Sequence, residues 1–129
     1  MAAQPEDDVN VLFVEDDPSV AQMYNLKLEL DGYQVAVAAD GEAAIQMATQ
    51  NPPDIIFLDI RLPKLDGLAV LEALRADERT KQVPVVILSN YSERELVERG
   101  LRLGALEYLI KSQTTPAKLA TGVESWLRG

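Results

Sequence analysis

The chain has 129 residues, of which 47% are hydrophobic and 26% charged, a composition typical of one globular domain. It contains no cysteine and no histidine, which excludes disulfides, metal sites with these ligands and catalysis by either side chain. The formal net charge of −9 gives no basic surface for nucleic acid or anionic membrane, and the apolar runs are too short to cross a bilayer. We therefore expect a cytoplasmic protein that binds neither nucleic acid nor membrane by itself.

The first eight residues are polar and acidic, and they are predicted to form a disordered tail before a single domain over residues 9–129. Short apolar runs then alternate with helix-length segments. The runs are rich in Val, Ile and Leu with little polar alternation, which is typical of parallel strands covered on both faces. The predicted strands are residues 9–14, 34–38, 54–58, 83–88 and 107–110.

Five amphipathic segments between and after these runs predict helices, most of them preceded by a residue that can cap the first turn. They are residues 18–30, 41–50 after Asp40, 67–75 after Asp66, 93–103 after Ser92, and a last helix that begins near Pro116 after Thr114 or Thr115. Five strand–helix units in a row predict an α/β fold, a doubly wound parallel sheet in a three-layer sandwich with right-handed crossovers.

Polar residues stand where four of the predicted strands end, at the edge where open parallel sheets bind ligands. They are Glu15-Asp16-Asp17, Asp59, Ser89-Asn90 and Lys111-Ser112. Carboxylates that lie close together repel each other, so that one is protonated or a cation joins them. An all-oxygen site suits Mg²⁺, and an aspartate beside Mg²⁺, a lysine and a serine has the components of phosphoryl transfer.

Each of these groups also has an ordinary interpretation. An acidic triplet is most often a solvated loop, and an aspartate after a strand is often a helix cap, although Asp59 is followed by Ile-Arg-Leu-Pro rather than by a helix. A single serine or lysine carries no information about function. The joint placement of all four groups at the ends of strands is what favours a functional site.

Four stretches of the chain resemble the receiver domain of two-component response regulators, over about residues 10–127. They are residues 11–18 (VLFVEDDP), 53–67 (PDIIFLDIRLPKLDG), 83–89 (VPVVILS) and 104–111 (GALEYLIK). The resemblance implies a flavodoxin-like sheet with strand order 2-1-3-4-5. It also implies a signalling domain, a stand-alone switch or a phosphorelay shuttle, that catalyses its own aspartyl phosphorylation and dephosphorylation.

The resemblance assigns the acceptor and the metal ligands. Asp59 is the implied phospho-acceptor, and a sensor histidine kinase or a histidine phosphotransfer protein is the implied donor in a Mg²⁺-dependent reaction. Glu15 and Asp16 form the acidic pair, with Asp16 the more direct Mg²⁺ ligand. The backbone carbonyl of Arg61 is a further implied ligand.

The same resemblance assigns the switch. Ser89 is the hydroxyl that turns towards the phosphoryl group, Lys111 is the paired lysine, and Tyr108 is the aromatic residue whose rotamer follows Ser89. The face made by the fourth helix, the fifth strand and the fifth helix is the implied binding surface for a downstream protein target. The domain is expected to be a monomer or a weak dimer through that face.

The chain departs from the usual pattern of the family after Lys111. Ser112 stands where a proline, often in the cis form, is common, and the loop at residues 112–115 is about one residue longer than usual. Asn90 also replaces a small residue. We expect the Lys111–Ser112 peptide to be trans, because a cis bond to a residue other than proline costs about 2.5–4 kcal/mol.

Two further side chains are expected at the mouth of the site. Arg61 is two residues past Asp59, and Tyr91 is two residues past Ser89. Neither suits the activation of water, because both remain protonated near neutral pH. We expect them to cover the approach of water and to prolong the life of the phosphorylated state.

Two other functions are open at this point. A pseudo-receiver would be a protein-binding module without phosphorylation, but such modules usually lack at least one of Asp59, Asp16, Ser89 and Lys111. A Mg²⁺-dependent hydrolase of the haloacid dehalogenase type would also use an aspartate nucleophile. That family has a second aspartate two residues after the nucleophile, where this chain has Arg61.

Overall fold

The computed structural model describes residues 9–128, so the predicted tail at residues 1–8 lies outside the described residues. Five parallel strands form one sheet in the order β2-β1-β3-β4-β5, which confirms the predicted topology. The strands are β1 (Asn10–Val14), β2 (Gln34–Ala38), β3 (Ile55–Leu58), β4 (Val85–Ser89) and β5 (Glu107–Ile110). The helices are α1 (Pro18–Leu30), α2 (Gly41–Gln50), α3 (Gly67–Ala76), α4 (Arg94–Arg102) and α5 (Pro116–Arg128).

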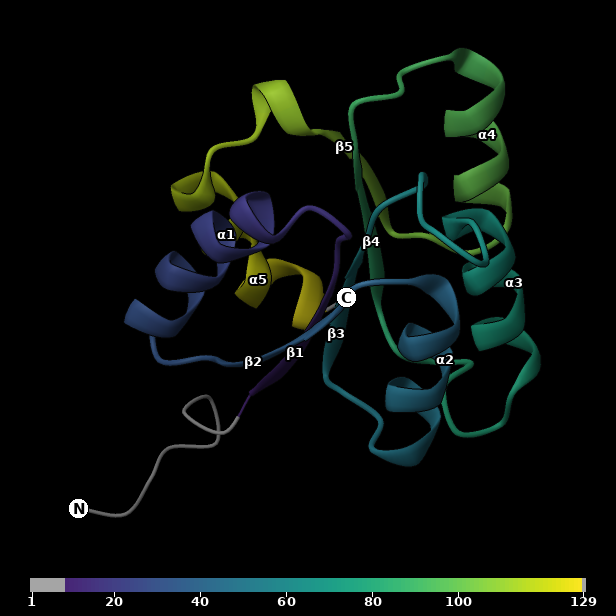
Figure 1. The fold of residues 1–129 in the computed structure, drawn as a ribbon, viewed down its shortest axis with the longest axis horizontal. Helices are drawn as coiled ribbons and strands as arrows, with labels where there is room; N and C mark the ends of the chain where they lie inside the picture. The colour runs from purple at the N-terminus through teal and green to yellow at the C-terminus, as the bar shows by residue number, and fades with distance from the viewer. Residues whose placement is uncertain (1–8, 129) are drawn as a thin grey trace.

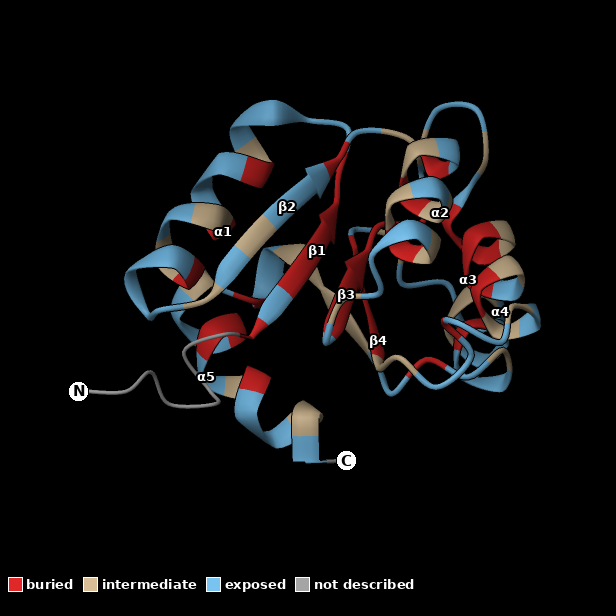
Figure 2. Ribbon diagram, turned by 90° about the horizontal axis from the view of Figure 1, so that it is seen from below, coloured by how far each residue is buried: buried red, intermediate tan, exposed pale blue. Residues whose placement is uncertain are grey.

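The sheet lies between two layers of helices. Helices α1 and α5 cover one face, and α2, α3 and α4 cover the other (Figure 1). Successive side chains of a strand point to opposite faces, so Phe57 of β3 packs with the α1–α5 layer while Ile56 and Leu58 pack with the other layer. All residues of β3 and β4 are buried, whereas β2 is largely exposed at the edge (Figure 2). Among residues 9–128, no helix combines the length and the apolar character that crossing a bilayer requires.

The helix caps agree with the sequence at three of four positions. The carboxylates of Asp40 and Asp66 accept the backbone N–H groups of the third residues of α2 and α3, and the Thr115 hydroxyl accepts that of Lys118 in α5. The predicted cap at Ser92 is wrong. Helix α4 begins at Arg94 with Glu93 in the N-cap position and no side-chain bond there. Ser92 therefore lies one residue too early for its hydroxyl to reach the N–H groups of the second and third helical residues.

The strand bounds differ from the prediction most at β4. Pro84 has no N–H to donate, so the strand begins after it, at Val85, and it extends to include Ser89. The functional consequence is that Ser89 is fixed within the sheet and is fully buried, instead of following the strand in a loop.

Gly67 brings α3 close to the end of β3. A Cβ atom on this residue would lie 2.0 Å from the backbone carbonyl oxygen of Asp59, which is far too close for any side chain. The N–H of Gly67 donates to the carbonyl of Ile60 at 2.8 Å. The first turn of α3 therefore holds the backbone on which Asp59 stands.

Candidate functional site

The candidate site lies at the carboxyl edge of the sheet, where the predicted acidic residues come together. Glu15 and Asp16 follow β1, and Asp59 follows β3. One carboxylate oxygen from each residue lies within 4.8 Å of the others. Glu15 and Asp59 are buried, at 3% and 5% exposure, whereas Asp16 is exposed. The cluster is therefore open to solvent on the side of Asp16.

Lys111 comes from the end of β5 and is the cation that faces this cluster. Its Nζ lies 2.8 Å from Oδ2 of Asp59 and 2.6 Å from Oε1 of Glu15. Burial lowers the pKa of Lys111, but the hydrogen bonds to the Asp59 and Glu15 carboxylates outweigh that effect and hold the pKa above its ordinary value. Lys111 therefore remains an ammonium group within the site.

Glu15 is the residue whose charge is hardest to sustain. Burial is the largest influence and raises the pKa of its carboxyl group, while the hydrogen bond from Lys111 lowers it and the nearby charge of Asp59 raises it. The N–H of Asp17 also donates to Oε2 of Glu15 at 3.1 Å. A buried carboxylate beside a second one gains stability from additional positive charge nearby.

The donor set fits a hard divalent cation. Three carboxylates face one ammonium group, so two negative charges remain without a partner when all three are ionised. Oxygen ligands with a solvent-open side are what Mg²⁺ requires, because it keeps several of its water molecules. The exposed carboxylate of Asp16 lies on that open side.

The two oxygens of Asp59 have different partners. Oδ1 accepts the N–H of Ile60 at 2.7 Å, and Oδ2 accepts the ammonium of Lys111 at 2.8 Å. The backbone N–H of Asp59 donates to the carbonyl of Val14 at 3.1 Å, which continues the pairing between β1 and β3. The carboxylate is thus fixed in orientation by the N–H of Ile60 on one side and by Lys111 on the other.

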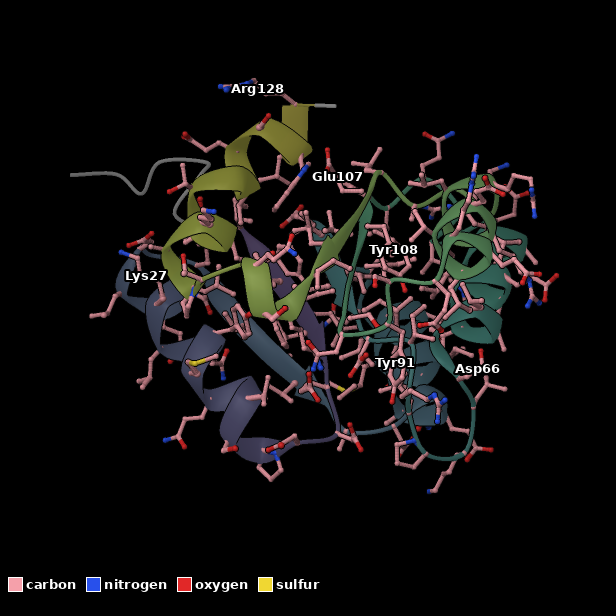
Figure 3. The ribbon with its side chains drawn as sticks, turned by 90° about the horizontal axis from the view of Figure 1, so that it is seen from above. Lys27, Asp66, Tyr91, Glu107, Tyr108 and Arg128 are labelled. Carbon is pink, nitrogen blue, oxygen red and sulfur yellow. The ribbon has the colours of Figure 1, made fainter. Side chains whose placement is uncertain are left out.

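Ser89 and Tyr108 are joined through the backbone of Tyr91. The hydroxyl of Ser89 accepts the N–H of Tyr91 at 3.0 Å, and the hydroxyl of Tyr108 donates to the carbonyl of Tyr91. Figure 3 shows the side chains of Tyr91 and Tyr108 near each other beside α4, and a Cβ on Gly100 would lie 3.4 Å from Cδ2 of Tyr108. Ser89 therefore faces the loop after β4 in this structure, and its hydroxyl has no hydrogen bond to Asp59 among those the structure describes.

Arg61 and Tyr91, which the sequence places at the mouth of the site, contact each other. The guanidinium carbon of Arg61 lies over the ring of Tyr91, 4.6 Å from its centroid. The stacked arrangement is a cation–π contact between the loop after β3 and the loop after β4. The sequence names the two side chains separately, and the structure shows that they contact each other.

Reasoning from sequence missed one contact close to the site. The hydroxyl of Tyr24 in α1 donates to the carbonyl of Thr114, in the loop after Lys111. No motif in the sequence singles out Tyr24. The available signal is the loop itself, in which Ser112 rather than a proline follows Lys111. The Lys111–Ser112 peptide is trans, as predicted, since no cis bond occurs in residues 9–128.

The family model for the response regulator receiver domain matches residues 11–124. The chain is 43% identical over 118 residues to the transcriptional regulatory protein PrrA of Mycobacterium tuberculosis, covering 92% of this chain and 49% of that protein. It is 40% identical over 101 residues to the DNA-binding dual master transcriptional regulator RpaA of Synechocystis, covering 78% of this chain and 42% of that protein. The chain thus spans about half the length of these curated relatives.

Solved structures share the fold over nearly the whole chain. A putative response regulator from Chloroflexus aurantiacus superposes with a TM-score of 0.87 at 34% identity, covering 95% of this chain and 99% of that one. The receiver domain of the sensor histidine kinase PA1611 from Pseudomonas aeruginosa, which has a magnesium ion coordinated in its active-site cleft, gives a TM-score of 0.86 at 31% identity, with coverage of 95% and 99%.

Proposed function

The chain belongs to the response regulator receiver domain family, and from that membership we propose that it is a phosphorylatable switch with Asp59 as the acceptor. The observation that carries the proposal is the pairing of a buried Asp59 with Lys111 beside two further carboxylates. Ordinary solvated aspartates have no such partners. A nucleophile needs an oriented carboxylate, and a transferred phosphoryl group needs positive charge around its oxygens.

In the proposed reaction, a carboxylate oxygen of Asp59 attacks the phosphorus of a phosphohistidine. An O–P bond forms, the P–N bond to the imidazole breaks, and the leaving nitrogen takes up its electron pair. Lys111 moves from Asp59 towards the new phosphoryl oxygens and stabilises their charge. Asp16, Asp59 and the backbone carbonyl of Arg61 would hold Mg²⁺ with Glu15 beside them, and the metal would supply positive charge to the same oxygens.

The proposed switch follows from the bonds of Ser89. When the Ser89 hydroxyl turns to donate to a phosphoryl oxygen, it gives up the N–H of Tyr91. The loop after β4 then loses one of its ties to the sheet, and the carbonyl that holds Tyr108 moves with it. The rotamer of Tyr108 can thus carry the state of Asp59 to the surface.

The proposed output surface is the face of α4, β5 and α5. Arg94, Val97 and Leu101 lie on α4, which contacts Tyr108 at Gly100, and Lys118 lies on α5. Leu101 is 46% exposed, which is high for a leucine on a helix that packs on a sheet. We propose that this surface binds a downstream protein and allows at most a weak dimer. Related chains named as transcriptional regulators are longer than this one, which supports an output that acts through another domain or protein.

The proposed input partner is a sensor histidine kinase or a histidine phosphotransfer protein, since this chain has no histidine of its own. The proposed location is the cytoplasm, where the donor domains of such kinases act. The pseudo-receiver alternative requires that the site be inactive, and the complete set of Asp16, Asp59, Ser89 and Lys111 argues against it. The hydrolase alternative lacks its general acid, because Arg61 stands at that position.

Incubation with Mg²⁺ and acetyl phosphate, followed by intact mass measurement, tests this function. We expect one added phosphoryl group per chain, and none when the divalent cation is removed by a chelator. A chain that stays unlabelled under these conditions, while folded and Mg²⁺-loaded, would be a binding module instead.

A further inference from the structure

One buried tyrosine of α1 is hydrogen-bonded to the loop that carries Lys111. Tyr24 of α1 is 1% exposed, and its hydroxyl donates to the carbonyl oxygen of Thr114 at 2.6 Å, across 90 positions of sequence. Burial raises the pKa of the Tyr24 phenol, so the hydroxyl keeps its proton and remains a donor. A hydrogen bond of this kind fixes the position of the loop relative to α1.

Thr114 in turn fixes the backbone of Lys111. A 3-10 turn spans Lys111–Gln113, and the N–H of Thr114 closes it by donating to the carbonyl of Lys111 at 3.1 Å. The Thr114 hydroxyl donates to the carbonyl of Ile110 at 2.9 Å. Three groups of one buried residue therefore hold the end of β5, the start of the turn and α1 together.

Tyr24 also contacts β1, the strand that leads to Glu15, which is one of the two carboxylate partners of Lys111. The ring of Tyr24 stacks on Phe13 of β1, with centroids 5.4 Å apart and an angle of 24° between the planes. Phe13 stands two residues before Glu15, whose carboxylate is 2.6 Å from Nζ of Lys111. Movement of the loop relative to β1 would therefore separate the ammonium group from both of its carboxylates.

We infer that Tyr24 and Thr114 are positioning residues for Lys111. The need for them arises at Ser112, which follows the lysine and has no ring to restrict its backbone. Without a restraint on this turn, the backbone that carries the lysine would be freer to move. The hydrogen bond from Tyr24 of α1 to the carbonyl of Thr114 supplies this restraint. The inference rests on the proposed function, because it concerns the lysine of the phosphorylation site.

The test uses Tyr24→Phe, which keeps the ring and its stacking on Phe13 and removes only the hydroxyl. The rate of labelling by acetyl phosphate is measured at saturating Mg²⁺, far below the melting temperature, so that it refers to folded molecules. We expect it to fall by about threefold to tenfold, the effect of one buried hydrogen bond. Mg²⁺ should still bind, because the carboxylate ligands follow β1 and β3 and are not altered by the substitution.

Tyr33→Phe is the matched control. Tyr33 also packs in the α1 layer, but it follows the far end of that helix, and it should label like wild type. If Tyr24→Phe is also labelled at the wild-type rate, the Tyr24 hydroxyl does not position Lys111 and the inference fails.

The variants Thr114→Val and Thr114→Ser form a second matched pair. Valine removes the hydroxyl that bonds to the carbonyl of Ile110, and serine keeps it. We expect Thr114→Val to be labelled more slowly than wild type and Thr114→Ser to be labelled at the wild-type rate. Equal labelling rates in the two variants would overturn the role of the Thr114 hydroxyl.

A readout without phosphorylation separates this inference from the proposed function. In wild type the Lys111 ammonium, held between two carboxylates, should give a distinct and slowly exchanging nitrogen resonance in NMR spectra. Tyr24→Phe should shift or broaden that signal, and Tyr33→Phe should not. An unlabelled wild type would refute the proposed function alone, whereas an identical Lys111 signal in Tyr24→Phe would refute the positioning role.

Discussion

The hydroxyl of Tyr108 donates a hydrogen bond to the backbone carbonyl of Tyr91, and the N–H of the same Tyr91 is bonded to the hydroxyl of Ser89. One peptide segment thus links a fully buried serine at the site with a half-buried tyrosine on β5. We predict that a change at Ser89 reaches the α4–β5–α5 face through this segment.

The first prediction concerns this route. Beryllofluoride with Mg²⁺, which mimics a phosphorylated aspartate, should shift the backbone resonances of the loop after β4, of Tyr108 and of α4. Tyr108→Phe lacks the hydroxyl that contacts Tyr91, so the shifts on α4 should shrink while those at Asp59 remain. Shifts confined to the immediate neighbours of Asp59 in wild type would mean that no switch is propagated.

The second prediction concerns the metal. Asp16→Ala should abolish Mg²⁺ binding as measured by titration calorimetry, because the cluster loses its solvent-facing carboxylate. Asp17→Asn is the control: it removes the neighbouring charge outside the cluster and keeps a good helix cap for α1. Comparable Mg²⁺ affinity in Asp16→Ala and wild type would place the metal ligands elsewhere.

Most of the fold follows from local patterns in the sequence, and the errors show where such patterns fail. The apolar run Ile-Ile-Phe-Leu of β3 predicts a buried parallel strand without knowledge of its neighbours. The start of α4 cannot be predicted in this way, because Ser92 is a good cap by type and only the backbone geometry shows that Glu93 occupies the N-cap position. A cap depends on one residue's φ and ψ, and these are set by packing of the whole helix.

Some contacts of the site can likewise be predicted from the sequence, and others cannot. That Asp59 and Lys111 meet follows from strand order alone, because the ends of parallel strands share one edge. The contact of Arg61 with Tyr91 and the bond from Tyr24 to Thr114 depend on the rotamers and on the exact paths of two loops. No periodicity or spacing encodes them.

The third prediction concerns the lifetime of the phosphorylated state. Arg61 is stacked on Tyr91. We predict that this pair covers the approach of water to Asp59, so that phospho-Asp59 decays slowly once the donor is removed. A cation–π contact at an exposed site contributes about 0.5–1 kcal/mol, so either partner alone should matter. Tyr91→Ala and Arg61→Asn should both speed the decay, measured as loss of the labelled mass with time.

Arg94→Asn is the control for lifetime, since this arginine of α4 is 89% exposed and pairs with Glu98. Its decay should match that of wild type. The shielding role is refuted when wild type itself loses the phosphoryl group within seconds, or when neither substitution at the cover changes the rate.

The fourth prediction concerns the support of Asp59 by α3. Gly67→Ala should lower the free energy of unfolding by about 1–3 kcal/mol, the usual cost of overpacking, because the new Cβ meets the Asp59 carbonyl. Gly41→Ala is matched, since its Cβ would meet the carbonyl of Leu65 at 2.1 Å. Denaturant titrations should show both losses, but only Gly67→Ala should slow labelling per folded molecule. Equal labelling rates in Gly67→Ala and Gly41→Ala would show that the contact between α3 and Asp59 does not affect phosphorylation.

The central claim is that Asp59 is the one acceptor of this domain, and mass measurement after treatment with acetyl phosphate and Mg²⁺ tests it most directly. Wild type and Asp66→Asn, which exchanges a nearby exposed helix cap for another good cap, should each gain one phosphoryl group. Asp59→Asn should gain none. If Asp59→Asn is labelled as fast and as fully as wild type, Asp59 is not the acceptor and the account is wrong.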